Sequence, residues 1–320
     1  MGGTRLNPGN VGAALGIIVL VLLVLWAPVL DDASWFLVWS DAAHAIVFGA
    51  VCFLSLFALR HSSVNARLPA SSHYLIALAV TIALGLATEL IQIPLNRDAS
   101  FGDVARDVIG AWIGAGIFAL FDGRLSRRAT IALAVTATIP GIIVAMPVVE
   151  NSAAYLRRSF AFPDIANFSA DFDDYFVRRQ AVDLSHDILP ATWSRSDREH
   201  ALHIGFGDNR WPGLEFREPP PNWSDYRILA LDITNPDKRE LELQLRVHDE
   251  KHDQSYSDRF NLTLTIPGGE RIVNRIPLEL VEDGPRSRKL DLEEVSALIL
   301  FVDGSLESNR EIYLSGIWLE

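Results

Sequence analysis

Six polar residues lie in or beside apolar segments of the first half of the chain, where their types could support acid–base or phosphate-binding chemistry. They are His44, Glu89, Gln92, Arg97, Asp103 and Asp107, with Asp41 one helical turn before the histidine. An ionisable group at membrane depth costs about 2.5–3.5 kcal/mol on insertion scales unless it faces a partner inside the protein. We therefore expect a polar pocket. If that pocket is catalytic, His44 and Glu89 would act as acid and base, and Arg97 would hold an anionic headgroup.

The same residues limit the chemistry. No obvious nucleophile stands among them, and one histidine with scattered carboxylates fits no zinc-ligand pattern. We predict no metal site and no cofactor here, and expect binding rather than catalysis. The alternative is an intramembrane hydrolase or transferase acting on a phosphorylated lipid carrier. A third reading makes this half a membrane anchor or assembly platform without chemistry of its own.

Structural roles also fit some of these residues. Ser100 and Asp103 form a Ser-x-x-Asp helix-capping pattern. Glu89 lies inside an apolar segment, where an unpaired carboxylate would be costly, so we expect Arg97 or His44 as its partner. The choice between a functional pocket and a structural ion-pair network stays open at this point.

Five apolar runs must position these residues. Each is about 18–22 residues long, which matches a hydrocarbon core about 30 Å thick. They cover residues 11–30, 42–59, 73–94, 104–121 and 129–149. Glu89 and Gln92 lie one turn apart near the end of the third run. Asp107, Gly110 and Gly114 share one stripe of the fourth run, and small residues there allow a neighbouring helix to approach closely.

The short loops carry unevenly distributed charge. Six arginines lie before the first run and in the loops after the second and fourth: Arg5, Arg60, Arg67, Arg124, Arg127 and Arg128. The opposite loops, 31–41 and 95–103, hold five aspartates and one arginine. The positive-inside rule therefore predicts a multi-pass protein of the plasma (inner) membrane, with residues 1–10 cytoplasmic and everything after residue 150 extracytoplasmic.

Residues 10–122 resemble the VanZ-like membrane proteins. The resemblance rests on three spaced motifs: Asp41-x-x-His44, Glu89-x-x-Gln92-x-x-x-x-Arg97 and Asp103-x-x-x-Asp107-x-x-Gly110-x-x-x-Gly114. It implies a four-helix transmembrane domain over 11–122, followed by a fifth helix over 123–149. It also implies a link to glycopeptide antibiotic tolerance and to envelope or exopolysaccharide genes. The chain departs from the family at Asp107, where asparagine is commoner, and at Ala42, where lysine is frequent. The first change replaces a neutral amide with a negative charge.

The second half of the chain has a different composition. Residues 1–149 hold 8 basic and 8 acidic residues, whereas residues 150–320 hold 20 basic and 32 acidic residues and so carry the whole net charge of −12. Such an acidic half argues against a nucleic-acid partner. The single cysteine, Cys52, excludes a disulfide within the chain.

Short segments with period-two alternation follow a juxtamembrane linker at 150–170 and predict antiparallel strands. They cover residues 200–206, 213–216, 227–234, 241–249, 259–265, 271–277, 297–302 and 311–319. About eight strands over 171–320 predict a two-sheet sandwich. The predicted fold class is a multi-domain membrane protein, with a five-helix transmembrane bundle followed by an all-β jelly-roll sandwich.

Residues 171–320 also resemble the galactose-binding-like jelly roll of many carbohydrate-binding modules. The resemblance rests on strand order and on Trp211-Pro-Gly-Leu-Glu-Phe, Trp223-Ser-Asp-Tyr-Arg-Ile-Leu-Ala-Leu-Asp, Asn235-Pro236 and the closing Ile312-Tyr-Leu-Ser-Gly-Ile-Trp-Leu. It implies a glycan-binding domain and allows a structural calcium.

A glycan would need aromatic rings and planar polar side chains gathered on one face. The segment from 241 to 265 offers such a set: Gln244, Arg246, His248, Asp249, Tyr256, Arg259 and Asn261. The alternative is a solvated sheet face with a charged hairpin loop. We expect the partners to be the lipid bilayer and an envelope polysaccharide or lipid-linked glycan, which the membrane pocket and the sandwich would hold together.

Overall fold

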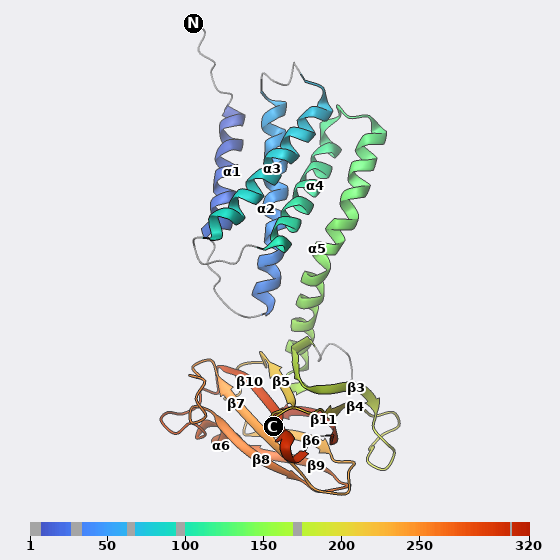
Figure 1. Cartoon of the computed structure of the whole chain (residues 1–320), viewed down its shortest axis with the longest axis vertical. Helices are drawn as coiled ribbons and strands as arrows, with labels where there is room; N and C mark the ends of the chain where they lie inside the picture. The colour runs from blue at the N-terminus through green and yellow to red at the C-terminus, as the bar shows by residue number, and fades with distance from the viewer. Residues whose placement is uncertain (1–7, 27–33, 63–67, 94–99, 169–174, 308) are drawn as a thin grey trace. The chain divides into compact units, whose positions relative to one another are not determined.

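The computed structural model describes residues 8–26, 34–62, 68–93, 100–168 and 175–320, apart from residue 308 (Figure 1). Its contacts divide the chain into two compact units, Met1–Ser152 and Ala153–Glu320. The first unit is helical and the second consists mainly of strands. The predicted fold class, five long apolar helices followed by an antiparallel β-sandwich, is confirmed.

Five helices are long and apolar enough to cross a membrane. They are α1 (Pro8–Trp26), α2 (Ser34–Arg60), α3 (Ala70–Gln92), α4 (Phe101–Asp122) and α5 (Arg127–Ala161). Each contains one of the five predicted runs or most of it. Helix α5 continues to Ala161, so the first part of the segment predicted as a linker is helical.

Helices α2 and α4 are in contact through their backbones. A Cβ atom built on Gly110 would lie 2.1 Å from the carbonyl oxygen of Ala45, and one built on Gly114 would lie 2.1 Å from that of Gly49. No side chain larger than hydrogen fits at these two positions of α4. The close approach predicted from the small-residue stripe is thereby confirmed.

Further toward the C-terminal ends of α2 and α4, a small apolar core joins α2, α3 and α4. Cys52 and Leu56 from α2 pack there with Tyr74 from α3 and Phe118 from α4. Cys52 is fully buried and is a free thiol. These contacts hold the three helices that carry the polar residues in fixed positions relative to one another.

The second unit contains two antiparallel sheets (Figure 1). Among the described residues the strands are β1 (Asp164–Ala166), β2 (Val177–Gln180), β3 (Val182–Ile188), β4 (His200–Phe206), β5 (Gly213–Arg217), β6 (Ile228–Thr234), β7 (Leu241–Asp249), β8 (Phe260–Ile266), β9 (Arg271–Pro277), β10 (Val295–Phe301) and β11 (Glu311–Leu319). Two short helices, α6 (Leu278–Glu282) and α7 (Gly304–Glu307), lie between strands. One sheet has the order β3-β4-β11-β6-β9 with β1 also paired to β11, and the other has the order β2-β5-β10-β7-β8.

Alternation along each strand explains the sandwich. On β7, Leu241, Leu243, Leu245 and Val247 are buried, while the residues between them point to the opposite face. Side chains from β4, β6, β10 and β11 complete the same core. The indole of Trp223 is fully buried within it, and its Nε1 donates to the Pro220 carbonyl over 2.7 Å.

Candidate functional site

The first candidate site lies where α2, α3 and α4 meet. His44 comes from α2, Glu89 from α3 and Asp107 from α4. His44 Nδ1 lies 3.2 Å from Asp107 Oδ1, and one donor atom from each of the three residues lies within 4.8 Å of the others. The backbone contact at Gly110 and Ala45, one turn away, sets the spacing between α2 and α4 at this level. Three of the residues predicted to form a polar pocket therefore lie together.

Glu89 is buried with only half of its carboxylate satisfied. Its Oε2 accepts a hydrogen bond from the backbone N–H of Ser100 over 2.9 Å. Ser100 is the N-cap of α4, since its Oγ accepts from the Gly102 N–H over 3.1 Å, as the capping pattern predicted. The second oxygen of Glu89, Oε1, has no hydrogen-bond partner among the described residues.

The other predicted members of the pocket lie outside this group. Asp41 and Asp103 both accept from Arg106, over 2.6 Å each, and so form an ion-paired bridge between α2 and α4. Gln92 is buried, and its Nε2 donates to the Val24 carbonyl of α1 over 3.4 Å. Arg97, the predicted partner of Glu89, falls outside the described residues.

A second polar network, which the sequence reasoning missed, lies at the other ends of these helices. Asp122, which is 3% exposed, accepts from the Tyr74 hydroxyl over 3.2 Å. It also pairs with Arg60 over 3.2 Å and with Arg124 over 2.8 Å. The available signal was an aspartate that directly follows an apolar run and lies close to loop arginines.

The second candidate site is the outer face of β7 and β8. Arg246 stands opposite Asn261 in the strand register, and Gln244 stands opposite Thr263, whose hydroxyl donates to the Gln244 amide oxygen over 2.9 Å. The hairpin loop that follows β7 folds back over this face. Nε2 of His252 in this loop lies 2.9 Å from Arg246 Nη2. The ring of His252 is tilted by 40° against that of His248, with 4.8 Å between the ring centroids.

Burial and neighbouring cations disfavour positive charge on this face, and the pKa values of His248 and Arg246 are lowered as a result. Burial lowers the pKa of His248 to about 4, with help from the positive charge of Arg246. Burial also lowers the pKa of Arg246 to about 10, again with help from its cationic neighbour Arg259. No ion pair joins Arg259 or Arg286 to a carboxylate among the described residues, and Glu215 acts on Arg246 only through its longer-range charge. The face therefore favours a negatively charged or strongly hydrogen-bonding ligand.

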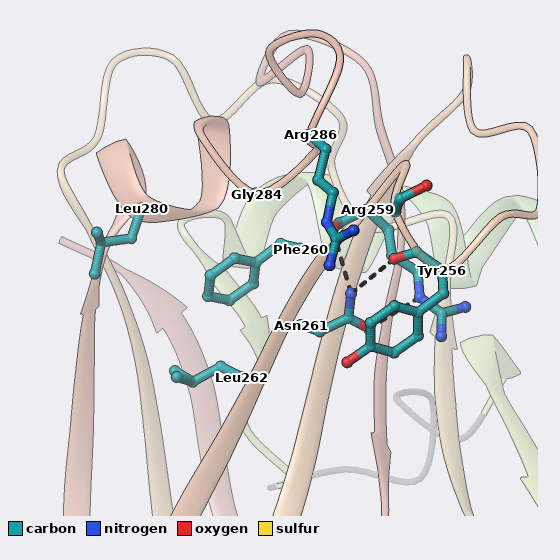
Figure 2. Close-up of a pocket in the computed structure, with 9 residues that line it drawn as sticks. Tyr256, Arg259, Phe260, Asn261, Leu262, Leu280, Gly284 and Arg286 are labelled. Carbon is teal, nitrogen blue, oxygen red and sulfur yellow. Dashed lines mark hydrogen bonds between the residues drawn. The ribbon is translucent and has the colours of Figure 1, made fainter.

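A pocket of about 400 Å³ opens at the edge of this face (Figure 2). It is lined by Tyr256, Ser257, Arg259, Phe260, Asn261, Leu262, Leu280, Gly284 and Arg286. Strand β8 is the edge strand of its sheet, so the pocket combines apolar residues from its inner side with polar residues from its outer side. Figure 2 shows Phe260, Leu262 and Leu280 on one side and Tyr256, Asn261 and the two arginines on the other.

Tyr256 is the exposed aromatic residue of the pocket. Its residue surface is 68% exposed, and the Arg259 guanidinium lies 5.0 Å from the ring centroid. Asn261 Nδ2 donates to the Tyr256 carbonyl over 3.2 Å, and Arg259 Nε donates to Asn261 Oδ1 over 2.9 Å. These bonds fix the tyrosine and the arginine at one end of the pocket.

Asp249 is placed differently from the other predicted glycan-binding residues. It continues the inward alternation of β7 and is 1% exposed. Arg288 donates to both of its carboxylate oxygens and to both oxygens of Asp258. The hydrogen bond from Arg288 holds the pKa of Asp258 at about 2 and also lowers that of Asp249. Asp249 therefore supports the hairpin loop from inside and has no oxygen free for a ligand.

Comparison with known proteins gives limited further information. No family model matches the chain, and no curated protein matches it. The VanZ-like resemblance of residues 10–122 thus stays a prediction.

Several solved structures resemble part of the chain. An exo-β-agarase matches with 17% identity and a TM-score of 0.41, over 49% of this chain and 24% of its own. The family 11 carbohydrate-binding module from Clostridium thermocellum, solved with a β-1,3-1,4-mixed-linked tetrasaccharide, has 14% identity and a TM-score of 0.36, over 49% and 93%. The CBM22-1 xylan-binding domain of Paenibacillus barcinonensis Xyn10C has 12% identity and a TM-score of 0.31, over 45% and 85%. This chain thus spans about a quarter of the agarase. These similarities are too low to infer a ligand of this chain from the ligands of those proteins.

Proposed function

We propose that this chain is a multi-pass protein of the cell-envelope membrane whose sandwich binds an envelope polysaccharide or the glycan of a lipid-linked precursor. The observation that carries the proposal is the pocket at the edge of β8. There an exposed tyrosine, an asparagine and two arginines surround about 400 Å³ of open space.

The pocket has the two kinds of group that sugars need. A sugar ring presents an apolar face that packs on an aromatic ring, and Tyr256 offers such a ring at 68% exposure. Sugar hydroxyls bond to planar polar groups, which Asn261 and Arg286 supply on the same side (Figure 2). The apolar wall of Phe260 and Leu280 suits the remaining ring carbons.

The charges favour a glycan that carries carboxylate or phosphate groups. Among the described residues Arg259 and Arg286 form no ion pair with a carboxylate, and Arg246 has only the longer-range attraction of Glu215, although residues 150–320 are acidic as a whole. A guanidinium binds a carboxylate or a phosphate with two parallel hydrogen bonds. A neutral glucan would leave these cations unpaired, so an acidic sugar is the better ligand.

The membrane half supports the location. Its five helices have the length and apolar composition of membrane spans. By the positive-inside rule, the arginine-rich loops predict a cytoplasmic N-terminus and a sandwich outside the cell membrane, where an envelope polysaccharide would be met. In this proposal the VanZ-like half places the sandwich at the membrane and contacts the lipid or phosphate end of the glycan.

A second candidate is an intramembrane enzyme acting on a phosphorylated lipid carrier. The observation that favours an enzyme is the contact between His44 Nδ1 and Asp107 Oδ1, which lie 3.2 Å apart with Glu89 beside them. A histidine and carboxylates in such contact can transfer a proton. If the protein is such an enzyme, the His44→Ala and Glu89→Gln variants should lose turnover while they fold and insert into the membrane normally. Full activity in both variants would exclude it.

Binding of glycans to the full-length protein in detergent micelles tests the main proposal. We expect retention on uronate- or phosphate-containing polysaccharide, weaker retention on neutral glucan, and binding that falls as salt is raised. Tyr256→Ala and Arg259→Gln should each weaken binding about tenfold, the effect of losing about 1.4 kcal/mol.

Trp211→Ala is the matched control. Trp211 is also an exposed aromatic residue, 41% exposed with Arg210 5.5 Å above its ring, but it lies outside the pocket. Binding that is lost in this variant as well would contradict a site at Tyr256. No retention on any glycan would remove the proposed function.

A further inference from the structure

The group of His44, Glu89 and Asp107 holds more negative charge than its described surroundings neutralise. Both carboxylates are buried, at 5% and 1% exposure, in α3 and α4, two helices with the length and composition of membrane spans. Glu89 Oε1 and Asp107 Oδ2 have no hydrogen-bond partner among the described residues. Leaving such oxygens unpaired is unfavourable, and more so when the group is charged. The arrangement calls for a cation.

We propose that His44, Glu89 and Asp107 bind one divalent transition-metal ion, of the Zn²⁺ or Mn²⁺ type. One donor atom from each residue lies within 4.8 Å of the other two. Bonds from such ligands to a metal are about 2.0–2.2 Å long, so the three side chains would have to draw closer together around a bound ion. The inference does not depend on glycan binding by the sandwich.

The nearest basic side chain along the helix is already engaged. Arg106 precedes Asp107 directly, but its guanidinium pairs with Asp41 and Asp103, over 2.6 Å each. His44 can carry at most one positive charge, which balances only one of the two carboxylates. A divalent ion balances both and leaves the imidazole neutral, the form that binds a metal.

A second group of one histidine and two aspartates in the same chain has an arginine as the cation that pairs with it. His252, Asp253 and Asp258 also bring their donor atoms within 4.8 Å of one another. There the Arg288 guanidinium donates to both oxygens of Asp258. No described residue plays the part of Arg288 beside Glu89 and Asp107, and this difference separates the two groups.

The packing around the first group favours a fixed site. A Cβ on Gly85 would lie 2.6 Å from Asp107 Oδ2, so the absence of a side chain one turn before Glu89 leaves room for that carboxylate. The contacts at Gly110 and Gly114 lock α2 against α4. Such rigidity lowers the entropy that a ligand set loses when an ion binds.

The donor set selects the class of ion. One imidazole nitrogen with two carboxylate oxygens suits Zn²⁺, Mn²⁺ or Fe²⁺, whereas Ca²⁺ and Mg²⁺ take sites built from oxygens alone. Three protein ligands leave at least one coordination position for water or for an oxygen of an anionic ligand. The sequence suggested no metal site because its three ligands stand on three different helices.

Metal binding to the full-length protein tests the proposal. The protein, purified in detergent and stripped with a chelator, would be titrated with Zn²⁺ and Mn²⁺, and with Ca²⁺ and Mg²⁺ for selectivity. We expect one Zn²⁺ or Mn²⁺ per chain and little binding of the other two ions. Pulsed electron paramagnetic resonance of bound Mn²⁺ should detect one coordinated imidazole nitrogen. No bound ion, or an ion without a nitrogen ligand, would overturn the proposal.

Variants place the ion. Glu89→Gln and Asp107→Asn should each lose more affinity than the about 10–100-fold that follows outer-shell changes. Asp103→Asn is the matched control, because Asp103 is one turn from Asp107 on the same helix and is paired with Arg106. Asp253→Asn changes the second group, of His252, Asp253 and Asp258, and should leave the metal affinity unchanged. Equal binding in all variants, or equal loss in Asp103→Asn, contradicts the site, and the wild-type resonance measurement decides if Asp107→Asn fails to fold.

Discussion

The backbone oxygen of Ala45 lies 2.1 Å from the position that a Cβ atom of residue 110 would occupy, so Gly110 and Ala45 bring α2 and α4 into direct main-chain contact. His44 precedes one end of this contact and Asp107 lies one turn before the other. The glycine therefore sets the separation of the two side chains as well as that of the helices. A longer side chain at residue 110 would move them apart.

Gly110→Ala should destabilise the helical unit by about 1–3 kcal/mol, because the added methyl group has no space and must push the helices apart. Thermal unfolding in detergent measures the change. Gly12→Ala is the matched control, since a Cβ at Gly12 meets nothing within 4 Å. Equal unfolding temperatures for the two variants would contradict the packing described.

Arg288→Met should destabilise the sandwich unit by about 3 kcal/mol, because it leaves the buried Asp249 carboxylate without its partner. Denaturant unfolding measures the loss. Lys251→Met is the control, since it breaks an exposed pair with Asp291 and should leave stability almost unchanged. If both variants unfold like the wild type, Arg288 does not hold the hairpin loop.

His248 should give the sandwich a pH-dependent stability. Burial lowers its folded pKa from 6.5 to about 4, so the unfolded chain binds more protons between these values. The free energy of unfolding should therefore fall as pH decreases through this range, by roughly 1–2 kcal/mol after allowance for partial solvent screening.

His248→Gln removes this contribution, so its stability should fall less than that of the wild type between pH 7 and pH 5. Above pH 7 the two stability curves should run parallel. Carboxylates such as Glu199, whose pKa Arg271 holds at about 2, lose their contribution only at lower pH, as they become protonated. A wild-type slope that persists in His248→Gln would assign the effect to another group.

The predicted orientation is tested by reporters fused after Glu320. We expect a reporter that folds only outside the cytoplasm to be active, and a fluorescent protein that matures only in the cytosol to be dark. The reverse pattern would place the sandwich inside the cell and end the proposal of an envelope ligand.

The sequence predicted the elements whose patterns are local. Length and hydropathy were enough for the helices, and alternation was enough for β4 to β11. The strands β1 to β3 were missed. They precede the regular alternation, and β1 lies in the segment predicted as a linker. The extension of α5 to Ala161 was missed because hydropathy marks apolar length and not the end of a helix.

The candidate sites could be predicted only where the spacing of residues along one helix or strand determines which side chains share a face. The glycine stripe indicated close helix packing, and this packing brings His44 to Asp107. The hydrogen bond from the Ser100 backbone N–H to Glu89 could not be predicted from the sequence, because every residue except proline has a backbone N–H donor. Asp249 could have been placed correctly, since it has the same parity on β7 as the buried Leu245 and Val247.

The single cysteine gives this protein a practical advantage. Because Cys52 is fully buried among apolar side chains, the native chain presents no thiol to a water-soluble maleimide. Cysteines introduced one at a time at loop positions can therefore be labelled in whole cells without first removing the natural one. The sidedness of every loop can be mapped in an otherwise unaltered protein.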